Sequence, residues 1–88
     1  MDRFYFTYGQ DERQPFIGGW TEVEAPDMDA AIAAFRVYHP DRDDAGFVNC
    51  AGIYPETEFA RTKMGRDGNN FGVGCREVIT LSRELVNE

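Results

Sequence analysis

Apolar and polar residues alternate along two segments near the amino end of the chain, and this alternation predicts two strands. Residues 3–8 are rich in aromatic and β-branched side chains. In residues 20–25 the alternation is strict, so that Trp20, Glu22 and Glu24 share one face. Because only one face of this second segment carries charge, we expect a half-exposed strand at an edge of its sheet.

A helical pattern follows between residues 28 and 38. Its apolar side chains fall on one helical stripe: Met28, Ala31, Ile32 and Phe35. Asp27 is the expected N-cap, because its carboxylate can accept a hydrogen bond from a free amide of the first turn. Pro40 predicts the end of the helix, since a proline disfavours helical geometry in the residue before it.

The second half of the chain predicts two further strands and a short helix. Residues 47–54 are apolar at even and odd positions alike, which is typical of a strand that is central in its sheet. Pro55 is expected to begin a short helix, because the first helical position tolerates proline. A glycine-dense loop at residues 65–74 then leads into a strand at 75–81. Residues 82–88 predict one more helical turn.

The element order ββαβαβ predicts an α+β domain: a two-layer sandwich in which two helices pack on one face of a four-stranded sheet. The 88 residues are expected to form a single domain, 1–88, because a second core would have too little surface to bury. No apolar run approaches the ~20 residues of a membrane span, and the start lacks the pattern of a secretory signal. We therefore expect a soluble, cytoplasmic protein.

The charge narrows the range of partners. Sixteen acidic against nine basic residues give a formal net charge of −7, which disfavours direct binding to nucleic acid or to anionic membranes. Residues two apart on a strand lie about 6.6 to 6.8 Å apart, so Glu22 and Glu24 project a row of charge that can approximate successive phosphates. The candidate partner-binding residues are Trp20, Glu22, Glu24, Asp27, Asp29, Asp41, Asp43 and Asp44.

This hypothesis requires the fold to gather the acidic residues into one patch that can enter a basic nucleic-acid channel. The simpler alternative is an ordinary solvated surface. Trp20 has two interpretations as well: a core residue under the sheet, or an exposed anchor of the kind found in interfaces.

A second candidate site is the glycine-rich segment 68–74, whose backbone amides could hold an anion such as the phosphate of a nucleotide signal. The ligand-binding residues would then be Asn69, Asn70, Phe71 and Arg76. Phosphate-binding loops usually open a helix, however, whereas this segment precedes a strand. The alternative interpretation is a turn that enters the last strand.

The remaining candidates for catalysis or metal binding are few. Cys50 and Cys75 are the only cysteines and His39 is the only histidine, so we expect no metal site and no cofactor. The two thiols could meet if their strands are neighbours, although free buried cysteines are commoner in a reducing compartment. No complete nucleophile-and-base pattern is present, which predicts that the chain is not an enzyme.

One short motif resembles the signature of a known family. His39-Pro40-Asp41 follows an amphipathic helix, as the same tripeptide does in J-domain co-chaperones. That family also needs a basic helix before the motif and a long helix after it, whereas here the helix is acidic and a strand is predicted next. We therefore expect a helix end with a surface histidine.

Four segments resemble a group of small, mostly uncharacterised proteins of bacterial phages and mobile elements: residues 4–9, 19–25, 49–54 and 71–79. The resemblance brings no catalytic residues. It implies an inhibitor of a host defence system, including the anti-CRISPR type, of which some members mimic DNA in charge. The expected partner is a host protein or ribonucleoprotein with a basic nucleic-acid channel. Self-association as a homodimer and a structural role in the phage are further alternatives.

Overall fold

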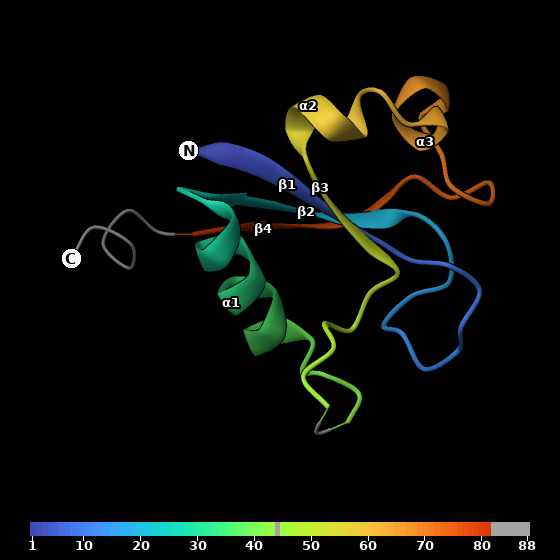
Figure 1. Cartoon of the computed structure of the whole chain (residues 1–88). Helices are drawn as coiled ribbons and strands as arrows, with labels where there is room; N and C mark the ends of the chain where they lie inside the picture. The colour runs from blue at the N-terminus through green and yellow to red at the C-terminus, as the bar shows by residue number, and fades with distance from the viewer. Residues whose placement is uncertain (44, 82–88) are drawn as a thin grey trace.

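The computed structural model describes residues 1–43 and 45–81, so the helical turn expected at 82–88 lies outside the described residues. Within them the chain forms an α+β fold with four strands and three helices (Figure 1), which confirms the predicted class. The order is ββαβααβ, with one helix more than the predicted ββαβαβ. In chain order the elements are β1 (Asp2–Thr7), β2 (Trp20–Ala25), α1 (Met28–Tyr38), β3 (Gly52–Pro55), α2 (Glu56–Phe59), α3 (Lys63–Asp67) and β4 (Cys75–Thr80). None of these helices has the length and apolar character that crossing a membrane requires.

The sheet has the strand order β3-β1-β2-β4, in which β1 is antiparallel to β2 and β3 while β2 and β4 are parallel. Two sequence predictions about this sheet are wrong. The strand β2 is an interior strand, because β4 comes back from the end of the chain to pair with it. The strand β3 is a short edge strand, and the apolar residues 47–51 before it form a loop in which Phe47 is 67% exposed.

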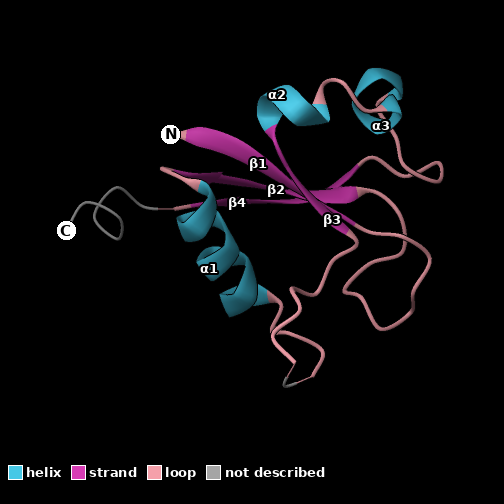
Figure 2. Cartoon of the chain, in the orientation of Figure 1, coloured by secondary structure: helices cyan, strands magenta, loops and turns pink. Residues whose placement is uncertain are grey.

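The helices lie on opposite faces of the sheet, with α1 below it and α2 and α3 above it in Figures 1 and 2, so the predicted packing of two helices on one face is wrong. The reason is the path of the chain. It crosses from β2 to β3 in one direction and from β3 to β4 in the other. Crossovers between parallel strands are almost always right-handed, and two such crossovers in opposite directions place their helices on opposite faces.

The main core lies between α1 and the sheet. Phe35 of α1 stacks on Phe6 of β1 with ring centroids 4.4 Å apart, and both side chains are fully buried. The other buried residues of this core are Phe4, Tyr8, Val23, Ala25, Ala31 and Ile79. At the start of α1 the side chain of Asp27 accepts a hydrogen bond of 2.8 Å from the amide of Ala30, which confirms the predicted N-cap.

A second, smaller apolar cluster lies on the opposite face, under α2. The buried ring of Phe59 stacks on Tyr5 at 4.1 Å and meets Trp20 edge-on at 4.9 Å. The chain then turns sharply into α3, and a Cβ atom on Gly65 would lie only 2.1 Å from the carbonyl oxygen of Phe59. This close approach requires glycine at position 65. Phe59 thus anchors the short helical segment to the sheet.

Candidate partner-binding surface

Three carboxylates surround one guanidinium on the α2 side of the sheet. The Nε atom of Arg3 lies 3.7 Å from Glu22 and 3.4 Å from Glu24, and its NH1 atom lies 3.4 Å from Glu56. We call these four residues the acidic cluster. Its formal charge is −2, because three carboxylates share one cation.

Strand pairing and one helix start position the acidic cluster. Arg3 pairs with Glu24 across the β1–β2 ladder, two residues along from the pair of Tyr5 and Glu22. These four side chains share one face, since residues two apart on a strand point to the same side. Glu56 arrives from a third element: it is the first residue of α2, directly after β3.

The charges of the acidic cluster shift the pKa of the groups beside them. The hydrogen bond from Arg3 to Glu24, together with the charges of Glu22 and Glu56, raises the pKa of the guanidinium above its ordinary value. Burial, followed by the charges of Glu22 and Glu56, likewise raises the pKa of Tyr5. Because the side chains of Glu22, Glu24 and Glu56 remain 22%, 31% and 54% exposed, a partner can reach the carboxylates.

The other predicted acidic residues lie elsewhere. Asp27 and Asp29 are at the amino end of α1, whereas Asp41 lies beyond its carboxyl end and pairs with Arg36 at 3.1 Å. The helix between them has 11 residues and is about 16 Å long at 1.5 Å per residue. Asp43 accepts a hydrogen bond from the amide of Ala45.

Asp44 lies outside the described residues. The fold therefore brings Glu22 and Glu24 together, adds Glu56 to them, and leaves the other described aspartates of the predicted set in two separate places. The single continuous patch expected from the sequence does not form among the described residues.

Trp20 is a core residue, which is the first of its two interpretations. It shares the face of Glu22 and Glu24, as the alternation predicts, but only 7% of it is exposed because Phe59 packs against it. The assignment of Trp20 as a partner-binding residue is therefore wrong. Its ring supports the sheet beside the acidic cluster and does not reach the surface as an anchor.

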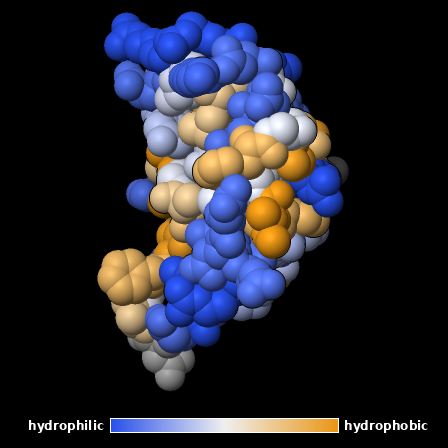
Figure 3. All heavy atoms as spheres, turned by 90° about the vertical axis from the view of Figure 1, so that its right-hand side faces the viewer, coloured by the Kyte–Doolittle hydropathy of each residue, from blue (hydrophilic) through white to orange (hydrophobic). Residues whose placement is uncertain are grey.

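The glycine-rich segment forms a tight turn before β4. The backbones of Asn70 and Val73 exchange two hydrogen bonds, and the amide of Gly72 donates to the side chain of Asn69. These amides are used within the turn and do not point together at an anion. Phe71 is 61% exposed in this turn. Figure 3 shows the side of the molecule that lies at the right of Figure 1, where apolar side chains are interspersed with polar ones.

Asn70 and Arg76, the other polar residues of this candidate site, make contacts within the protein. The side chain of Asn70 donates to the carbonyl oxygen of Tyr8 at 2.6 Å and so attaches the turn to the end of β1. The guanidinium of Arg76 lies 5.0 Å from the ring centroid of Phe16 in a cation–π contact. These contacts support the interpretation of the segment as a structural turn.

One partly buried polar network has no signal in the sequence. Tyr8 and Thr21 form a hydrogen bond of 2.6 Å, Thr21 donates to Glu77 at 2.9 Å, and His39 is hydrogen-bonded to the same carboxylate. His39 is therefore half-buried and not the surface histidine expected after α1. The chain continues from His39 into a loop and β3, as predicted, and not into the long helix that the J-domain signature requires.

The cysteines are free and apart. Cys50 lies in the loop before β3 and Cys75 at the start of β4, and these strands occupy opposite edges of the sheet. Burial raises the pKa of Cys50 to about 11. Within residues 1–43 and 45–81, no three His, Cys, Asp or Glu side chains gather in a group that could hold a metal ion.

Known proteins offer no guide to the acidic cluster, which is therefore interpreted from its geometry alone. No family model matches the chain, and neither a curated protein nor a solved structure matches it.

Proposed function

We propose that this chain is a non-enzymatic binding protein of the phage or mobile-element type, which inhibits a host defence effector by placing its acidic cluster in a basic nucleic-acid channel. The wider patch expected from the sequence does not form among the described residues, so the proposal rests on the acidic cluster alone, where negative charge is in excess around Arg3. Three exposed or half-exposed carboxylates share a single cation, so the cluster can accept further Lys or Arg side chains from a partner.

The physical setting of the acidic cluster supports this role. Two of its carboxylates are on adjacent positions of one strand face and the third is on the first turn of a helix, so all three are held by regular structure. A preorganised charged surface loses less conformational freedom on binding than one built on loops. The net charge of −7 adds long-range attraction, which accelerates the encounter with a basic partner.

The test is competition with DNA for a purified CRISPR effector complex at increasing salt. The variant Glu24→Gln should weaken the competition about twofold to fivefold, the range expected for one exposed ion pair. Arg3→Gln should strengthen it by a similar factor, because the cluster then loses its internal cation. Both effects should decrease as salt screens the charges.

Glu12→Gln is the matched control, since it removes one exposed negative charge from the loop between β1 and β2, outside the acidic cluster. It should change competition less than Glu24→Gln does. The proposed function is wrong if the wild-type protein does not compete with DNA. It is also wrong if the strength of competition of the three variants follows their net charge alone, wherever the charge is removed. Circular dichroism of each variant checks that the fold is retained.

A further inference from the structure

Helix α1 is apolar over far more of its surface than the sheet can cover. At 100° per residue its apolar side chains occupy roughly 260° of the circumference, and only Asp29 and Arg36 lie in the remainder. One side of α1 packs on the sheet through Ala31 and Phe35. On another side, about 120° from Ala31 around the helix, Val37 is 78% exposed, and Tyr38, the last residue of the helix, is 61% exposed.

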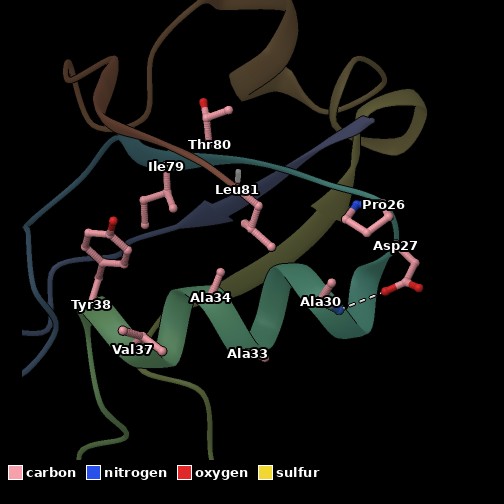
Figure 4. Close-up of a pocket in the computed structure, with 10 residues that line it drawn as sticks. All are labelled: Pro26, Asp27, Ala30, Ala33, Ala34, Val37, Tyr38, Ile79, Thr80 and Leu81. Atoms are coloured by element: carbon pink, nitrogen blue, oxygen red, sulfur yellow. Dashed lines mark hydrogen bonds between the residues drawn. The ribbon is translucent and has the colours of Figure 1, made fainter. Parts of the chain in front are cut away.

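This second side of α1 faces a groove. Figure 4 shows the groove between α1 and the end of β4, with Ile79 and Leu81 projecting toward the helix and Ala30 and Ala34 of α1 opposite them. Its volume is about 550 Å³. Its lining is mostly apolar, and the polar side chains in it are those of Asp27, Tyr38 and Thr80. Small alanine side chains along one helix flank allow another helix to approach closely.

The strand beside this groove has an open edge. β4 is the last strand of the sheet, and among residues 1–43 and 45–81 no strand pairs with its outer side. The amide of Leu81 donates to the carbonyl of Glu24 in β2, so the peptide groups of Val78 and Thr80 point away from β2 by the alternation of a strand. Val78 is also 58% exposed. An edge of this kind is a template for another strand.

We propose that a second copy of this chain covers both features, with the two β4 strands paired antiparallel about a two-fold axis and the two α1 helices packed side by side. A two-fold interface requires a surface that is complementary to itself. The edge of a strand meets this requirement, because its outward amides and carbonyls pair with those of an antiparallel copy. The apolar flank of α1 meets it as well, since the exposed Val37 of one copy can fill the alanine-lined groove of the other.

The charges at this edge are compatible with self-pairing. When Val78 lies opposite its own copy, the sequence of β4 places Arg76 opposite Thr80 of the second copy and Glu77 opposite Ile79, so no like charges face each other. The antiparallel arrangement also places Asp27, at the amino end of one α1, near the carboxyl end of the other. The two Asp27 carboxylates are then separated by about the 16 Å length of the helix.

Sedimentation equilibrium of the full chain tests the dimer over concentrations from about 10 μM to about 1 mM. We expect a mass that rises toward twice the 10.0 kDa of one chain. Val37→Glu should reduce the mass to that of one chain, because it places a charge in the interface. Val78→Pro should do the same by removing an outward amide, whereas Val78→Thr, which keeps that amide, should still dimerise.

Phe47→Glu is the control for the charge, because it also replaces an exposed apolar residue, 67% exposed, but lies outside the groove. It should dimerise like the wild type. The thermal midpoint should rise with concentration for the wild type and not for Val37→Glu. A full-length protein that stays at one chain at every concentration overturns the proposal, and so does a dimer that both Val37→Glu and Val78→Pro leave intact. A single-chain protein that Val37→Glu destabilises would show that another part of the same chain covers the groove.

Discussion

Replacing Phe59 by alanine tests the account of the α2 side of the sheet. The ring of Phe59 is 7% exposed, and it contacts Tyr5, Trp20 and Tyr54 at centroid distances of 4.1, 4.9 and 6.2 Å. A buried Phe→Ala substitution costs about 3 to 5 kcal/mol, as the sum of lost burial and a residual cavity. The four-residue helix α2 can partly settle into the gap. We therefore expect a loss of about 3 kcal/mol in the free energy of unfolding.

For a domain of this size, that loss lowers the thermal midpoint by about 12 to 24 °C. Urea denaturation is the suitable assay, because the only tryptophan of the chain, Trp20, lies against Phe59. Native-state emission of Trp20 should also shift to the red in Phe59→Ala, since water gains access to the indole. Far-ultraviolet circular dichroism provides a second, independent signal of unfolding.

Phe71→Ala is the matched control, because it makes the same substitution at a ring that is 61% exposed. It should change the free energy of unfolding by no more than about 0.5 kcal/mol and leave Trp20 emission unchanged. A loss below about 1 kcal/mol for Phe59→Ala, or a loss equal to that of Phe71→Ala, would refute the role of Phe59 as the anchor of α2.

Two further predictions concern single side chains. Tyr8→Phe should lower the free energy of unfolding by about 1 to 2 kcal/mol, because it removes the 2.6 Å hydrogen bond to buried Thr21, while Tyr38→Phe, at a ring that is 61% exposed, should have little effect. Urea titration of the two variants measures the difference, and equal losses would contradict the prediction. Burial raises the pKa of both thiols, that of Cys50 to about 11, so the thiolate fraction of Cys50 at pH 8 is about 10⁻³. Because Cys75 is the exposed thiol, iodoacetamide should modify it first. Mass spectrometry of the peptides follows this order, which faster labelling of Cys50 would disprove. The raised pKa means that the fold favours the protonated thiol of Cys50. The stability that this thiol contributes is complete below the pKa of the unfolded thiol, about 8.5, and is lost as pH rises toward 11. Cys50→Ser should reduce this loss of stability at alkaline pH.

Local patterns in the sequence were enough to predict individual elements. The strict alternation at residues 20–25 placed Glu22 and Glu24 on one face, and the register of β2 bears this out. The carboxylate of Asp27 begins α1, and the helix ends at Tyr38, before Pro40. Each of these features depends on neighbours a few residues away, within reach of the periodicity and of the capping and proline rules.

Contacts between distant parts of the chain were decided by the tertiary structure. Strand β4 pairs with β2 only after the chain has crossed the sheet twice, which makes β2 an interior strand and places the helices on opposite faces. Glu56 joins Arg3 in the acidic cluster across 53 residues, and His39 meets Glu77 across 38.

The sequence by itself therefore determined three of the four strands (β1, β2 and β4), the first helix and the sign of the net charge. Only the tertiary structure decided which carboxylates share a cation, that Trp20 is buried, and that the apolar flank of α1 lies beside an open sheet edge. The physical reason is that a side-chain period specifies which face of an element is apolar, whereas the order in which strands pair depends on long-range packing and on the handedness of the crossovers.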